Sequence, residues 1–118
     1  MLQVIGRFLR LLFGYRSIQI IEDTTTKISF RFGPTVTVFD KDLSQVLQNG
    51  KLVAMMPLIT EIQVYQPTSQ ASTPAWFVST RVSGARSVEI GQATEKEEAA
   101  HVAGLISAFV KKPVKIQR

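Results

Sequence analysis

Only a few side chains in this sequence could carry out catalysis. Among 118 residues there is one histidine, His101, and no cysteine. A Ser–His–Asp arrangement needs a serine and a carboxylate beside that histidine, and no serine in the sequence stands out as its partner. His101 lies in an apolar helical stretch, about 200° from the centre of the apolar stripe, so we expect it to face solvent. The sequence therefore predicts no catalytic residue and favours a protein that is not an enzyme.

One short motif has the residue types of a calcium site. Residues 40–44, "DKDLS", resemble the start of an EF-hand loop, but Gln45 replaces the glycine of the turn and Lys51 stands where the bidentate glutamate belongs. We interpret Asp40 and Asp42 as a turn residue and a helix N-cap. A zinc site would have to rely on carboxylates, and the sequence has no glycine-rich phosphate loop. We expect neither a metal nor a cofactor.

The charge of the chain is concentrated at its two ends. The net charge is +5, yet residues 17–110 hold seven basic against nine acidic side chains. Residues 1–16 contain three arginines and no acid, and residues 111–118 contain three lysines and Arg118. A nucleic-acid-binding domain carries its charge on the face that meets the phosphates, whereas charged ends suit an anionic membrane surface. Nucleic-acid binding is therefore the weaker alternative.

The N-terminal segment, residues 1–16, combines apolar and basic residues. Its arginines leave apolar runs of about four residues, too short for a signal-peptide core of 7–15 or a membrane span of about 20. On a helix it has a wide apolar face and a narrow cationic ridge. Such a helix could pack on its own domain, lie in a membrane interface, or form dimer contacts. The residues that we expect to contact a membrane or a partner are Arg7, Phe8, Leu9, Arg10, Leu12 and Phe13, with Lys111, Lys112 and Lys115.

Alternation of apolar and polar residues predicts about seven strands after this segment. Short connections favour an antiparallel meander over a parallel sheet. Pro57 marks a bend, a short helical turn is expected after Asp42, and the Asn49–Gly50 pair predicts a turn. Trp76 is expected to fill the core. The predicted strands are residues 17–23, 27–33, 35–40, 51–56, 58–66, 75–82 and 86–93, with a polar loop at 67–74.

A helix over residues 95–110 has clear end signals. Thr94 and Glu97 form a capping box with Thr94 as N-cap, and Pro113 ends the helix. The apolar stripe predicted to face the sheet consists of Ala99, Val102, Ala103, Ile106 and Val110. On another face, small residues recur every four positions and would allow close approach of a second helix, or they form an alanine-rich solvent face. These candidates for a helix–helix contact are Ala100, Gly104 and Ala108.

Residues 76–114 resemble the end of bacterial pleckstrin-homology-like (PH-like) domains. The resemblance rests on "WFVSTRV", the turn "SGAR", the strand end "VEIG", the helix "TEKEEAAHVAGLISAFV" and the tail "KKPV". It implies a mainly β fold, an antiparallel barrel or sandwich of about seven strands capped by the C-terminal helix. Many similar proteins carry two membrane spans ahead of the domain, and phosphoinositide-binding relatives have a basic first hairpin loop. Here that loop, "EDTTTK", carries Glu22 and Asp23. An OB-like barrel is the alternative fold.

The sequence thus predicts two parts, an amphipathic segment at 1–16 and a PH-like domain at 17–118. The predicted function is a non-catalytic adaptor or binding module, held at an anionic membrane surface or by a membrane protein. We expect a cytoplasmic protein, located at the inner face of the membrane if it binds there. The alternative is a self-associating module whose N-terminal helix is buried in a homo-oligomer.

Overall fold

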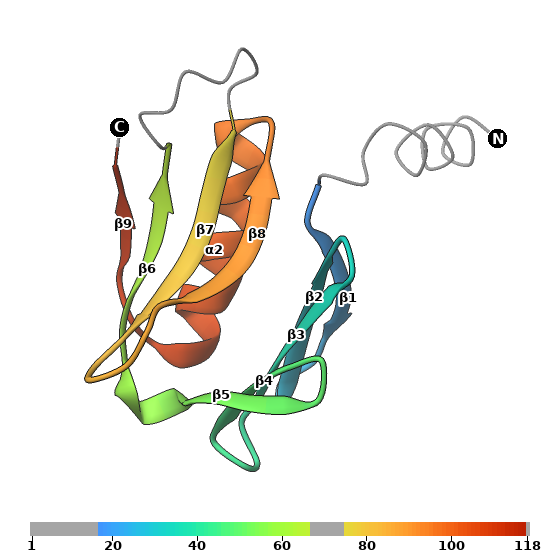
Figure 1. Ribbon diagram of the computed structural model, residues 1–118, viewed down its shortest axis with the longest axis vertical. Coiled ribbons are helices and arrows are strands. Elements are labelled where there is room, and N and C mark those ends of the chain that lie inside the picture. The colour runs from blue at the N-terminus through green and yellow to red at the C-terminus, as the bar shows by residue number, and fades with distance from the viewer. Residues whose placement is uncertain (1–16, 67–74, 118) are drawn as a thin grey trace, which may run out of the picture.

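The computed structural model describes residues 17–66 and 75–117. The predicted N-terminal helix and the predicted loop at 67–74 lie outside the described residues. The described part is mainly β, with nine strands in two sheets and one C-terminal helix, as Figure 1 shows. The sequence predicted seven of these strands and the helix.

Five strands in chain order form an antiparallel meander, here called sheet A. They are β1 (Gln19–Asp23), β2 (Lys27–Phe32), β3 (Thr35–Asp40), β4 (Gln45–Gln48) and β5 (Lys51–Met55). The β4–β5 hairpin turns at Asn49 and Gly50, whose φ angles of 51° and 81° are those of a two-residue type I′ turn. The Oδ1 atom of Asn49 also accepts a hydrogen bond from the backbone N–H of Val36, at 2.9 Å. The predicted turn is therefore confirmed, and its asparagine ties the hairpin to β3.

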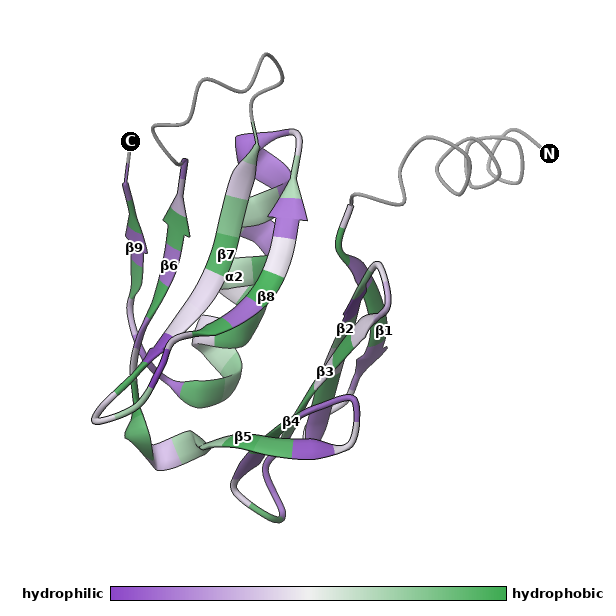
Figure 2. Cartoon of the chain, in the orientation of Figure 1, coloured by the Kyte–Doolittle hydropathy of each residue, from purple (hydrophilic) through white to green (hydrophobic). Residues whose placement is uncertain are grey.

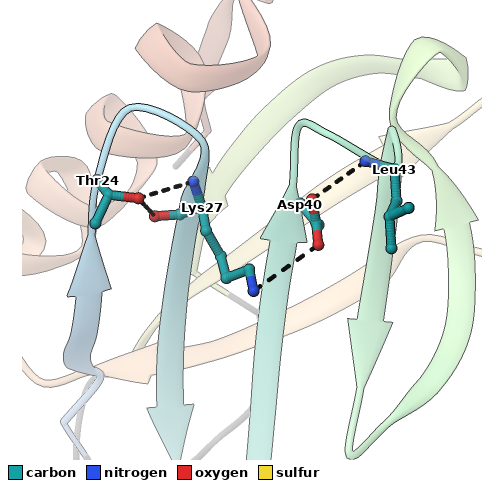
Figure 3. A network of polar contacts seen from close by, with 4 residues as sticks. All are labelled: Thr24, Lys27, Asp40 and Leu43. Atoms are coloured by element: carbon teal, nitrogen blue, oxygen red, sulfur yellow. Dashed lines mark hydrogen bonds and ion pairs between the residues drawn. The ribbon is translucent and has the colours of Figure 1, made fainter.

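The helical turn predicted after Asp42 was wrong, because β4 occupies most of that stretch. Val46 is fully buried and pairs with Phe39, so the segment adds a strand to the sheet instead of coiling. Asp40 does act as a turn residue: its Oδ1 accepts a hydrogen bond from the backbone N–H of Leu43 at 3.2 Å, and its Oδ2 lies 3.9 Å from Lys27 Nζ (Figure 3). Since no helix begins here, Asp42 is not an N-cap.

The other four strands form sheet B, in the order β8-β7-β6-β9. They are β6 (Ile59–Tyr65), β7 (Trp76–Val82), β8 (Val88–Ala93) and β9 (Val114–Ile116). A 3₁₀ turn, η1 (Met56–Leu58), contains Pro57 and joins the two sheets, which confirms the predicted bend. Within sheet B, β6, β7 and β8 are antiparallel.

β9 contradicts the expectation of a purely antiparallel fold, because it pairs with β6 in parallel. The backbone N–H of Ile62 donates to the Pro113 carbonyl at 2.9 Å, and that of Gln117 donates to the Val64 carbonyl at 2.7 Å. The chain returns along the helix before it enters β9, so the last strand runs in the direction of β6 (Figure 1). Pro113 lacks an N–H group and contributes only its carbonyl.

The helix α2 (Lys96–Val110) packs on one face of sheet B and lies behind β7 and β8 in Figure 1. Its buried residues are Ala99, Val102, Ala103, Ile106 and Phe109, so Phe109 takes the place predicted for the half-buried Val110. Trp76 is also half-buried, at the edge of the core. The core continues across to sheet A through Ile28, Phe30, Phe39 and Val46.

The start of α2 differs from the predicted capping box. Glu95 is the N-cap, in an extended conformation without a side-chain capping bond, and its carbonyl accepts the first helical hydrogen bond from Ala99 N–H at 3.2 Å. Thr94 is exposed and lies outside the helix. β8 continues to the buried Ala93, which keeps the chain extended and delays the helix start. The prediction of Thr94 as N-cap was therefore wrong.

The expected barrel or sandwich is found only in part: the described strands form two sheets, but these are not joined edge to edge and do not close into a barrel. They meet where β2 lies against β8. At this contact Gly91 faces Phe32 and Ile18, and a Cβ atom at Gly91 would lie only 2.7 Å from the Cβ of Phe32. The side chains of Phe32 and Ile18 thus pack directly on the backbone of Gly91. This contact joins the two sheets without a hydrogen-bonded ladder between them.

Candidate functional site

The residue types first considered for catalysis lie apart from one another. His101 is exposed on α2, as the sequence predicted, and Asp42 is exposed in the β3–β4 turn. Within the described ranges no three histidine, cysteine or acidic side chains come together in a way that could hold a metal ion. None of the described helices is long and apolar enough to cross a membrane.

The basic residues expected to contact a membrane or partner are only partly described. Lys111 and Lys115 are exposed and Lys112 is half-buried. Lys111 ends α2 at the lower end of the molecule in Figure 1, whereas β1 begins at the upper end. β9, which carries Lys115, then runs back up beside β6, so the C-terminal lysines are not gathered at one end of the fold. Arg7 and the other N-terminal candidates lie outside the described residues.

The folded part of the chain is nearly neutral. Its described residues hold ten basic and nine acidic side chains, which leaves a net charge of +1 of the total +5. The remaining four positive charges are Arg7, Arg10, Arg16 and Arg118. Any strong attraction to an anionic surface must therefore involve residues 1–16.

The small residues on α2 lie on its outer side. Gly104 and Ala108 are exposed and Ala100 is half-buried. No atom lies within 4 Å of the position that a Gly104 Cβ would occupy, apart from the helix's own backbone and chain neighbours. Among the described residues, therefore, no other element packs against Gly104.

Sheet A has an apolar outer face on the side away from the core. Residues that alternate with the buried Phe39 and Val46 point to this side. Val38, Leu47 and Leu52 lie in one row across three strands, because Val38 pairs with Leu47 and Leu47 pairs with Leu52. We define the outer apolar face as Val36, Val38, Leu47, Leu52 and Met55. Leu52 is 53% exposed and Met55 38%, and Figure 2 shows hydrophobic residues along much of β5.

A groove of about 240 Å³ lies where the β2–β3 hairpin meets sheet B. Its walls include Phe32 and Thr35 from the hairpin, Tyr65 from β6, Phe77 from β7, and Glu89 and Gly91 from β8. Tyr65 and Phe77 alternate with the buried Val64 and Val78, so their rings point to the face of sheet B opposite α2. The groove is therefore formed by the outer face of sheet B and the end of sheet A.

The two aromatic rings of the groove are held together by strand pairing. Tyr65 and Phe77 are direct partners in the β6–β7 ladder, and their rings stack with centroids 5.5 Å apart. The Tyr65 hydroxyl donates a hydrogen bond of 3.0 Å to Glu89 Oε1. Burial, together with this bond and the charge of Glu89, raises the pKa of Tyr65 to about 12. The groove thus keeps a neutral phenol against an acidic side chain.

A second polar contact fixes the position of Glu89. Gln48 Nε2 donates to the backbone carbonyl of Glu89 at 2.6 Å and also lies 3.1 Å from Thr37 Oγ1. These bonds run from the core face of sheet A to the edge of β8. They hold the strand that carries the carboxylate against sheet A.

Sequence reasoning missed this groove. Tyr65 and Phe77 fall within the predicted strands 58–66 and 75–82, and neither belongs to a local motif. The usable signal was that each is an aromatic residue at an outward-facing position of neighbouring predicted strands, but their pairing depends on a register that the sequence does not specify. Comparison with protein-family models, curated proteins and solved structures finds no match to this chain.

Proposed function

We propose that the chain is a non-catalytic, PH-like binding module that contacts an anionic membrane surface through residues 1–16 and the outer apolar face of sheet A. The observation that carries this proposal is that the outer apolar face belongs to the sheet whose first strand directly follows residues 1–16. The basic, apolar segment thus leads into β1, an edge strand of the same sheet, and β2 separates β1 from β3, the first strand of the outer apolar face.

The PH-like part of the proposal is supported by the order of the elements. Antiparallel strands in two sheets are followed by a C-terminal helix that packs on the second sheet. The open arrangement of the sheets and the added strands β4 and β9 depart from the expected barrel or sandwich of about seven strands. The likeness therefore rests on element order and on residues 76–114.

Several small free-energy contributions would add up to membrane binding. Full burial of a leucine side chain contributes about 1.5–3 kcal/mol, so the half-exposed Leu52 could add about 1 kcal/mol at a lipid interface. Arg31 is exposed and pairs with Val36 of the outer apolar face, and a basic residue near an anionic leaflet adds about 1 kcal/mol. These terms alone give weak binding. Arg7 and Arg10 with their apolar neighbours would have to supply the rest.

The test is sedimentation of the full chain with vesicles, using Leu52→Glu and a matched control, Leu58→Glu. Leu58 is 47% exposed but lies in η1, outside the outer apolar face. We expect Leu52→Glu to weaken binding to anionic vesicles at least about fivefold, the equivalent of 1 kcal/mol, and Leu58→Glu to change it little. Changing Arg7 and Arg10 to Gln should weaken it further and reduce its dependence on salt.

Other outcomes separate the alternatives. Failure of the full chain to bind protein-free anionic vesicles would reject the membrane surface and leave a membrane protein as the partner. Concentration-dependent association that Gly104→Leu abolishes would favour the self-associating module, in which Ala100, Gly104 and Ala108 form a helix contact. Tight, salt-dependent binding to nucleic acid would favour the weaker alternative.

A further inference from the structure

The residues that line the groove between the β2–β3 hairpin and sheet B favour a positively charged ligand. It combines two stacked aromatic rings, Tyr65 and Phe77, with the Glu89 carboxylate. It lies on sheet B, away from the outer apolar face of sheet A, so what it binds does not depend on the membrane proposal.

The size of the groove limits the occupant. Pockets for drug-sized ligands and cofactors have volumes of about 300–1,000 Å³, and this groove has about 240 Å³ and is open to solvent. A nucleotide or an extended cofactor would exceed it. One long side chain of a partner protein fits the available space.

The charge of the groove limits the occupant further. Glu89 is exposed and uses Oε1 to accept the Tyr65 hydroxyl, and among residues 17–66 and 75–117 no lysine or arginine forms an ion pair with it. The carboxylate therefore keeps acceptor capacity for an external donor. Aromatic faces attract cations through the ring quadrupole, and an anionic group would be repelled by both features.

We propose that this groove binds an arginine side chain of a partner protein, with the guanidinium stacked on the Phe77 and Tyr65 rings and hydrogen-bonded to Glu89. Arginine suits the site better than lysine because its planar guanidinium stacks on aromatic rings and directs several donors to a carboxylate. The site is preorganised: the rings are held by the β6–β7 register, and Gln48 fixes the backbone at Glu89. Binding thus requires little ordering of the groove.

The probe is the blocked tripeptide acetyl-Ala-Arg-Ala-amide, titrated into the full ¹⁵N-labelled chain and followed by NMR. The same peptide with citrulline, which has the shape of arginine without its charge, is the ligand control, and a lysine peptide is a third ligand. We expect saturable millimolar binding, with shifts concentrated at Phe77, Glu89 and Gly91. The lysine peptide should bind more weakly and the citrulline peptide should not saturate.

Two variants test the named contacts. Glu89→Gln keeps an acceptor for the Tyr65 hydroxyl but removes the charge, and Phe77→Leu removes one ring. Each should weaken binding of the arginine peptide by about fivefold to tenfold, the range expected for a charge-assisted hydrogen bond or a cation–π contact. Glu97→Gln removes an equivalent charge from an exposed position on α2 and should leave binding unchanged.

Three results would overturn the proposal. The first is equal binding of the citrulline and arginine peptides. The second is arginine-peptide binding that neither Glu89→Gln nor Phe77→Leu weakens. The third is binding that appears only after Arg7, Arg10 and Arg16 are all changed to Gln, since this would identify the chain's own N-terminal segment as the occupant.

Discussion

Gly91 and Phe32 join the two sheets at a distance that leaves no room for a side chain on the glycine. A Cβ atom added to Gly91 would lie 2.7 Å from both the Cβ and the Cγ of Phe32, and 2.8 Å from Ile18 Cγ1. The Cβ of Phe32 is bonded directly to the backbone and stays in place when the side chain rotates. Rotation of the Phe32 ring therefore cannot relieve the conflict. The close approach of β2 to β8 therefore requires glycine at this position.

We expect Gly91→Ala to lower the free energy of unfolding by about 1–3 kcal/mol, the range for an overpacked core. Urea denaturation monitored by Trp76 fluorescence measures it. Gly104→Ala is the matched control, because no atom lies within 4 Å of its Cβ position outside its own helix. It should stabilise α2 by about 1 kcal/mol. Equal effects of the two substitutions would mean that β2 and β8 do not approach as described.

The start of α2 gives a second prediction. Thr94 lies outside the helix and Glu95 is an N-cap without a side-chain capping bond. Thr94→Ala should therefore change the free energy of unfolding by less than about 0.5 kcal/mol, as for an ordinary surface substitution. Glu95→Asp should stabilise by about 0.5–1 kcal/mol, since aspartate can accept a hydrogen bond from the first turn while the charge is kept. If Thr94→Ala instead lowered the free energy of unfolding by about 1 kcal/mol, Thr94 would be the N-cap of the helix, as the capping box predicted.

The end of α2 contains a strained residue. Lys111 has φ 59° and ψ 47°, in the left-handed region, while its N–H donates to the Ser107 carbonyl at 2.7 Å. A left-handed conformation costs an L-residue about 1–2 kcal/mol, and glycine avoids most of that cost. Lys111→Gly should therefore raise the thermal midpoint of unfolding. Lys112→Gly, one residue further, should lower the thermal midpoint or leave it unchanged. If Lys112→Gly raised the midpoint and Lys111→Gly did not, the left-handed residue that ends the helix would not be Lys111.

Local patterns predicted most elements of this fold but not how the sheets combine. The alternation in residues 35–40 and the Asn49–Gly50 pair specified β3 and a hairpin turn. The stretch at 45–48 was ambiguous because the adjacent Val46 and Leu47 suit either a helix or a strand, and pairing with β3 decides between them. β9 is only three residues long, and it pairs with β6 because the preceding helix α2 ends close to β6. Barrel closure and the Tyr65–Phe77 pair depend on contacts distant in sequence, which no local pattern encodes.

The tyrosine of the groove gives a pH-dependent prediction. Burial first, and then the hydrogen bond and charge of Glu89, raise the pKa of Tyr65 from 10.0 to about 12. The folded state thus holds this proton more tightly than the unfolded chain. The resulting stability is fully present below pH 10 and is lost as the pH rises through about 12.

In the wild type, therefore, tyrosinate absorbance should show one ionisation near pH 12, and Tyr65→Phe should remove it. As the pH rises from 10 to 12, the unfolding free energy of the wild type should fall relative to that of Tyr65→Phe. Ionisable groups that the two proteins share contribute equally to both and cancel in this difference. Glu89→Gln should lower the pKa of Tyr65 but keep it above 10.0, because burial is the largest cause and remains. A Tyr65 pKa of 10 in the wild type would mean that the phenol is solvated and does not donate to Glu89, and the groove would then lack its fixed carboxylate.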